Sequence, residues 1–117
     1  MADVTVLKPT TDPQGAGKKL KLRKPLEVNG ETVRELPYDF EQMTVGNKLM
    51  ATRNMASAGY SMSNAEELDP VYHLFLFAKA VEVATKEAIS TPDILRMSAK
   101  DGQAAGALAR DFFYLSD

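Results

Sequence analysis

The spacing of the apolar residues changes abruptly around Leu36-Pro37-Tyr38, and this change limits the folds open to the chain. Before it, apolar and charged residues alternate, as in "KKLKLRK", which is typical of a half-buried strand. After it, the apolar residues recur at helical spacing. The sequence therefore predicts an α+β fold, in which an N-terminal β-hairpin (18–37) is followed by a bundle of three to four α-helices in a helical body (44–115).

The dipeptide Asn29-Gly30 predicts the turn of the hairpin, since both residues tolerate the positive φ of a tight primed turn. A two-residue turn pairs Leu26 with Val33 but puts Leu36 on the other face. A three-residue loop with a glycine bulge sets Leu36 opposite Leu22 instead. We favour the bulge because it buries Leu36.

Capping residues predict where the helices begin. A side-chain oxygen at the N-cap accepts hydrogen bonds from the first free amides, and proline fits the first helical position. The predicted starts are Thr44 for a helix closed by Gly59, Asp69-Pro70 for a helix over about 70–88, Thr91-Pro92 for a short helix, and Ser98 with Asp101 for the last one. In the last helix, Gly102 and Gly106 predict the close approach of another helix.

The helix over 70–88 carries two apolar groups. Val71, Leu74, Phe77, Ala78 and Val81 belong to one broad apolar arc, and beyond a polar stripe lies a second group of Tyr72, Leu76 and Val83. A helix that is apolar on two faces is either buried on both sides or reserved for a partner.

The length of 117 residues suits one domain, which we place at 18–117. Residues 1–17 hold two prolines, two glycines and few apolar side chains, so we expect a flexible N-terminal arm. The alternative is that "VTVL" in this arm pairs with a sheet edge, including one in a partner.

The composition excludes several kinds of chemistry. The chain has no cysteine and a single histidine, which removes thiolate nucleophiles and conventional zinc sites. We interpret His73 as a surface or capping-side histidine paired with Asp69. No run of about 18 apolar residues suggests a membrane span, and no secretory signal is apparent. We therefore expect no enzyme activity, no catalytic or metal-binding residues, no cofactor and no membrane contact.

The charge is unevenly distributed. Residues 1–24 hold six basic and two acidic side chains, a net charge of +4, which leaves −6 on the rest. The basic segment has no interleaved aromatic residue for base stacking, and alternating lysines protect a strand edge. Nucleic-acid binding is therefore the weaker alternative to a non-enzymatic interaction protein.

The order of several motifs resembles a known family. These are a strand ending in "KP", then "NGETVREL", "MTVGNKLMA", "DPVYHLFLFAKA", "ISTPDILRMSAKD" and a closing "DFF". Over about residues 20–114 the chain is similar to the tail assembly chaperones of Mu-like and related bacteriophages, which are encoded ahead of the tape measure protein.

The resemblance implies a protein without enzyme activity. Such a chaperone coats the long, helical tape measure protein in the cytoplasm of the bacterial host, keeps it soluble and is absent from the mature virion. It also implies self-association and, in some relatives, a longer frameshift product of the same gene. The alternative is a structural tail subunit, such as a tube or completion protein, that stays in the particle.

A chaperone of an amphipathic helix needs apolar surface that tolerates many partner sequences. The second apolar group of the long helix and the methionines of the first helix are our candidates for that surface. The predicted partner-binding residues are Tyr72, Leu76, Val83, Met50 and Met55. The same residues could serve self-association.

Overall fold

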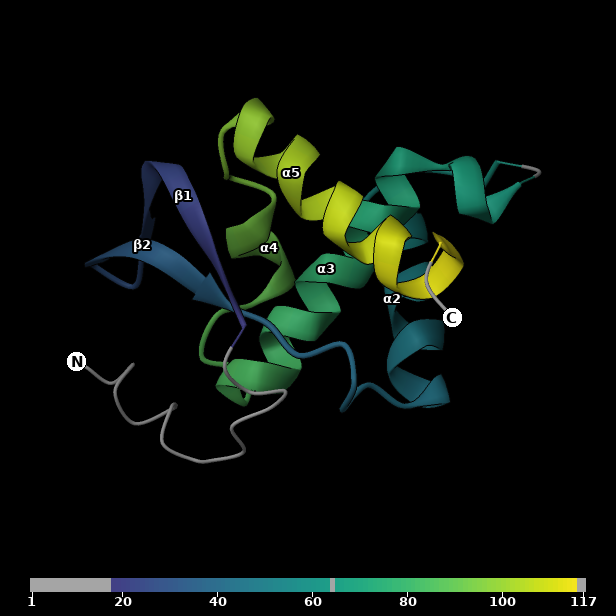
Figure 1. Cartoon of the computed structure of the whole chain (residues 1–117), viewed down its shortest axis with the longest axis horizontal. Helices are drawn as coiled ribbons and strands as arrows, with labels where there is room; N and C mark the ends of the chain where they lie inside the picture. The colour runs from purple at the N-terminus through teal and green to yellow at the C-terminus, as the bar shows by residue number, and fades with distance from the viewer. Residues whose placement is uncertain (1–17, 64, 116–117) are drawn as a thin grey trace.

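The computed structural model describes residues 18–63 and 65–115. Its elements are β1 (Lys19–Val28), β2 (Glu31–Pro37), α2 (Val45–Ser57), the 3-10 turn η1 (Glu66–Leu68), α3 (Pro70–Thr85), α4 (Thr91–Ile94), α5 (Ala99–Arg110) and the π-helical turn η2 (Asp111–Leu115). The fold is α+β, an antiparallel hairpin followed by four helices, as predicted. The predicted N-terminal arm lies outside the described residues. The hairpin lies at one end of the molecule, and α2 and η2 lie at the other (Figure 1).

The turn of the hairpin has two residues, so the predicted three-residue loop is wrong. Val28 pairs with Glu31, and Asn29 and Gly30 between them have φ values of 52° and 83°. Both values fall in the left-handed region that a primed turn requires and that matches the twist of the two strands.

A bulge does exist, but it lies inside β1 and not at the turn. Residues 22–25 lie opposite Arg34 alone, which shifts the register of the two strands. Beyond this bulge Leu36 pairs with Leu20, and not with Leu22 as we expected. Leu36 is nevertheless fully buried, so the physical reason for expecting a bulge was sound while its position was wrong.

Helix α3 is the centre of the fold and is buried on both apolar sides. Its main neighbours are α5 and α2, with α4 and β2 also in contact. Phe77 and Val81 from the broad arc are fully buried, and so is Leu76 from the second group. Of the two interpretations of this helix, burial on both sides is therefore the correct one.

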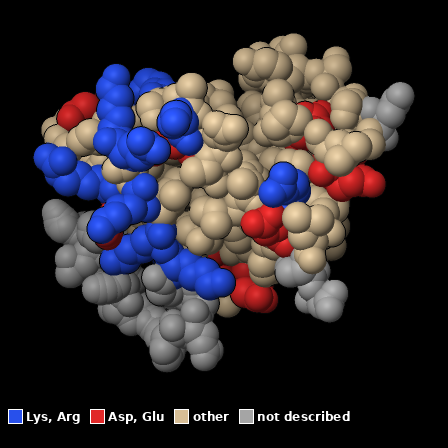
Figure 2. Space-filling view, turned by 45° about the horizontal axis from the view of Figure 1, so that its top comes forward, with Lys and Arg blue, Asp and Glu red and all other residues tan. Residues whose placement is uncertain are grey.

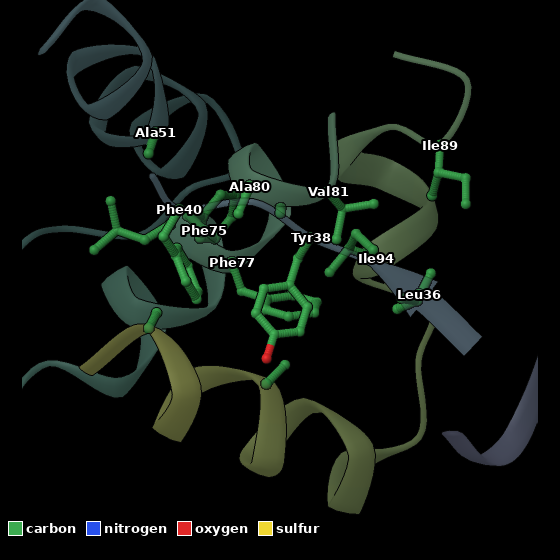
Figure 3. Packing of buried hydrophobic residues seen from close by; sticks show 14 of the residues in the cluster. Leu36, Tyr38, Phe40, Ala51, Phe75, Phe77, Ala80, Val81, Ile89 and Ile94 are labelled. Atoms are coloured by element: carbon green, nitrogen blue, oxygen red, sulfur yellow. The ribbon is translucent and has the colours of Figure 1, made fainter. Parts of the chain in front are cut away.

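Aromatic rings join the hairpin to the helices. Tyr38 and Phe40 follow β2 directly and both are buried. The Tyr38 ring centroid lies 5.4 Å from that of Phe77, and Phe40 stacks on Phe112 at 5.2 Å. In Figure 3, Tyr38, Phe40 and Phe77 lie together in the core. The change of period in the sequence thus marks the point where the chain enters this core.

The capping residues act as predicted at the starts of α2, α3 and α5, whereas the N-cap of α4 is Ser90 and not Thr91. Side-chain oxygens of Thr44, Asp69 and Ser98 accept hydrogen bonds from amides of the first turns of α2, α3 and α5. The long helix ends at Thr85, three residues before the predicted end. Lys86 and Glu87 adopt positive φ values of 53° and 69° and close the helix there.

The two glycines of α5 differ in their surroundings. A Cβ atom on Gly106 would lie 3.7 Å from the Cβ of His73 and 3.7 Å from the carbonyl oxygen of Pro70, so α3 approaches α5 closely at this point, as predicted. A Cβ on Gly102 would meet nothing within 4 Å. The prediction of a close approach at Gly102 is therefore wrong, because that side of α5 faces open space.

We expect Gly102→Ala to raise the free energy of unfolding by about 0.5–1 kcal/mol, because alanine loses less backbone entropy in a helix and meets no clash here. Urea denaturation followed by circular dichroism measures the change. Gly30→Ala is the matched control: its Cβ also meets nothing within 4 Å, but its φ of 83° makes alanine strained. Lower stability of Gly102→Ala would contradict the open environment at this position.

Candidate functional site

The predicted partner-binding residues do not form one exposed surface. Tyr72, Leu76 and Met55 are buried in the core, because α2 and α5 pack against α3. Assigning these three residues to a partner surface is therefore wrong. Val83 is half-buried and Met50 is exposed. Of the five residues, Met50 is the one with substantial exposure.

Two exposed apolar residues of α2, Val45 and Leu49, are missing from our predicted partner-binding residues. Ala51 and Met55 face the core, whereas Val45 and Leu49, one turn apart, are 76% and 64% exposed. The sequence pattern identifies the apolar residues of the helix, but it does not show which of them pack against the core. Here the small Ala51 packs inward. The first two turns of α2 thus present an apolar face without a partner in the described part of the chain.

Glu66 of η1 joins α2 to the C-terminal turn. The Lys48 Nζ lies 3.3 Å from the Glu66 Oε1, and the Tyr114 hydroxyl donates a hydrogen bond of 2.7 Å to the same oxygen. The Lys48 Nζ also lies 5.8 Å from the ring centroid of Tyr72 and 5.9 Å from that of Tyr114. These contacts fix the first half of α2 relative to η1 and η2.

His73 of α3 also contacts Glu66. It is buried, and its Nε2 lies 3.0 Å from the carbonyl oxygen of Glu66. Because a carbonyl oxygen only accepts, this Nε2 carries the proton. Our expectation of a surface histidine paired with Asp69 is wrong, since the Asp69 carboxylate accepts from the amides of Ser63, Val71 and Tyr72.

The charge states of Glu66 and Tyr114 suit a structural role in which they hold α2, η1 and η2 together. The hydrogen bond from Tyr114 and the charge of Lys48 hold the pKa of Glu66 below its ordinary value, against the effect of burial. Burial and the bond to Glu66 raise the pKa of Tyr114. The carboxylate therefore stays charged and the phenol stays neutral around pH 7, and neither group is poised for proton transfer.

Exposed leucines lie beside this junction. Leu68, two residues after Glu66, is 74% exposed, and Leu115, next to Tyr114, is 66% exposed. Both line a hollow of about 360 Å³ with Glu67, Arg110 and Tyr114. We define the apolar end surface as Val45, Leu49, Met50, Leu68 and Leu115, which belong to elements that meet at Glu66.

A second hollow, of about 500 Å³, lies between α2, α3 and α4 and contains a buried ion pair. The Lys79 Nζ lies 2.6 Å from the Glu82 Oε1, and the Glu82 Oε2 accepts two hydrogen bonds of 2.7 Å from the amide and hydroxyl of Thr91. Both carboxylate oxygens are thus occupied by the protein itself. This cluster links α3 to α4.

Within residues 18–63 and 65–115 no cluster of three or more acidic or histidine side chains could hold a metal ion. No helix among these residues is long and apolar enough to cross a membrane. No family model, curated protein or solved structure matches the chain.

Proposed function

We propose that the protein is a non-enzymatic chaperone of phage tail assembly, which binds the tape measure protein through the apolar end surface and keeps it soluble. The observation that supports this proposal is the exposure of Val45 and Leu49 on the outer side of α2. Large apolar side chains that face water in a group are typical of protein-binding surfaces.

The shape and chemistry of this surface suit an amphipathic helix. Val45 and Leu49 are one turn apart and can pack on apolar positions repeated every three to four residues of a partner helix. Met50 adds a flexible side chain that adapts to different partner sequences. Glu67 and Arg110, which line the adjacent hollow, supply charges of both signs at its rim. A long helical client offers many such segments.

In this proposal the protein acts in the cytoplasm of the bacterial host during tail assembly and leaves before the tail is complete. Its contacts with the client have to be reversible, which a small apolar surface allows because the area buried by each copy is limited. A longer product of the same gene and contacts between copies belong to the same proposal, on the basis of the resemblance in the sequence.

Leu49→Asp together with Leu68→Asp is expected to weaken binding of the tape measure protein at least tenfold while leaving the fold intact, since both side chains are largely exposed. Pull-down with tagged protein measures binding, and circular dichroism measures the fold. Leu95→Asp is the matched control, because Leu95 is also exposed but lies beside the hollow between α2, α3 and α4.

Undiminished pull-down by the double variant would remove the apolar end surface as the binding site. Mass spectrometry of purified virions then separates the chaperone from a structural tail subunit. A chaperone is expected to be missing from the particle, whereas a tube or completion protein would be present in many copies and would overturn the proposed function.

A further inference from the structure

A group of exposed cations lies at the end of the molecule opposite the apolar end surface. We define the basic strip as Lys21, Arg23, Lys24, Arg96 and Lys100, all of which are exposed. Lys21, Arg23 and Lys24 belong to β1, the last two within its bulge, whereas Arg96 follows α4 and Lys100 lies in the first turn of α5. Figure 2 shows the Lys and Arg side chains gathered over the hairpin side of the molecule.

The base of the basic strip is held rigidly. The carboxylate of Asp101 accepts hydrogen bonds of 2.9 Å from the amide of Arg23 and 3.1 Å from the amide of Lys24. The guanidinium of Arg96 donates to the carbonyl oxygen of Glu27 on the outer edge of β1. A charged surface on a fixed backbone loses less entropy when a partner binds.

The basic strip is more positive than the net charge of the chain suggests, because several carboxylates are buried. Asp39, Asp69 and Asp101 are all buried and accept hydrogen bonds from backbone amides. These carboxylates contribute to the formal net charge of −2 but expose almost no charge to a partner. Among the described residues, Arg96 of the strip pairs with Asp93 at 3.0 Å, and no ion pair involves Lys21, Arg23, Lys24 or Lys100.

We infer that the basic strip is a second docking surface, which binds an acidic segment of a protein partner. A protein is favoured over nucleic acid because Glu27, Glu31 and Glu35 are exposed on the same hairpin and would repel a continuous row of phosphates. A protein segment can place neutral or basic residues opposite these glutamates. Since this inference concerns the other end of the molecule, it stands independently of the proposed function.

The test uses a fluorescein-labelled peptide in which glutamates alternate with serines, so that neutral residues can lie opposite the exposed glutamates of the hairpin, with binding followed by fluorescence anisotropy. Arg23→Gln, Lys24→Gln and Lys100→Gln combined are expected to weaken binding roughly tenfold, since each exposed cation contributes a small amount. Glutamine preserves the backbone amides that Asp101 needs. The matched control carries Arg53→Gln, Lys86→Gln and Arg110→Gln, which remove the same charge from the helical part and are expected to leave binding nearly unchanged.

The inference also predicts that binding weakens as salt is raised and that Leu49→Asp with Leu68→Asp does not affect it. Equal loss in the two triple variants would overturn the inference, because net charge alone would then explain the binding. Absence of binding at low salt would overturn it as well. Tighter binding of a duplex DNA probe that depends on the same three cations would replace the acidic protein segment with nucleic acid.

Discussion

Asp101→Ala is expected to lower the free energy of unfolding by about 3 kcal/mol or more. The Asp101 carboxylate is almost fully buried and accepts from the amides of Arg23 and Lys24 and from the hydroxyl of Ser98. Alanine would leave the two bulge amides without their acceptor in a partly buried place. Urea denaturation followed by circular dichroism measures the loss. A change below about 1 kcal/mol would mean that water satisfies these amides equally well.

The same carboxylate makes stability depend on pH. Burial alone would raise the pKa of Asp101, but its hydrogen bonds to Arg23, Lys24 and Ser98 stabilise the charged form and hold the pKa below its ordinary value of 3.8. A depressed carboxyl pKa stabilises the fold above the unfolded value, and this contribution is lost as pH falls through the folded value. Stability should therefore decline below about pH 4.

Asp101→Asn distinguishes the contribution of the Asp101 charge to stability from that of its hydrogen bonds. Asparagine keeps one acceptor oxygen of similar size, so it should destabilise the protein less than alanine does at pH 7. It cannot titrate, so the decline in stability below about pH 4 should be smaller in this variant than in the parent protein. An identical decline would assign the acid sensitivity to Glu66, Asp69 and Asp93, whose pKa values are also lowered.

Leu76→Asp is expected to unfold the protein. Leu76 is 0% exposed at the centre of α3, and a carboxylate there would have neither water nor a charged partner. Removing a buried leucine side chain alone costs about 2–5 kcal/mol, and small domains are stable by about 5–15 kcal/mol in total. The expected result is loss of the helical circular dichroism signal and of a cooperative unfolding transition.

Leu49→Asp is the matched control for Leu76→Asp, because both substitutions replace a leucine within a helix. Leu49 is 64% exposed, so its carboxylate stays hydrated and the change in the free energy of unfolding should remain within about 1 kcal/mol. A folded Leu76→Asp variant that had lost only client binding would restore our original interpretation of α3 as a partner-binding helix.

Features that depend on neighbouring residues could be predicted from the sequence. The side chains of Thr44, Asp69 and Ser98 cap amides two or three positions away, so their effect requires no knowledge of the rest of the fold. The position of the turn at Asn29-Gly30 is an equally local signal, although its length of two residues was not the one we favoured. These signals were sufficient to place the hairpin and the helix starts.

Features that depend on contacts between distant elements could not be predicted in the same way. The pattern of α3 identified its apolar residues, but Leu76 is buried because α2 and α5 both pack on α3. Asp101 has the spacing of a capping box with Ser98, yet its carboxylate also holds the amides of Arg23 and Lys24. Nothing in the local sequence pattern reveals that second role of Asp101. The sequence pattern also did not indicate that Leu68 and Leu115 are exposed.

The link between Asp101 and Arg23 spans 78 positions of the chain, and it affects the order in which the protein can fold during synthesis. The hairpin is made before the helices, and the acceptor for the amides of its bulge is made 78 positions after Arg23. Until α5 leaves the ribosome, the bulge therefore lacks its anchor and α3 lacks one of its two covering helices. Folding into the final structure is thus expected only after α5 has left the ribosome.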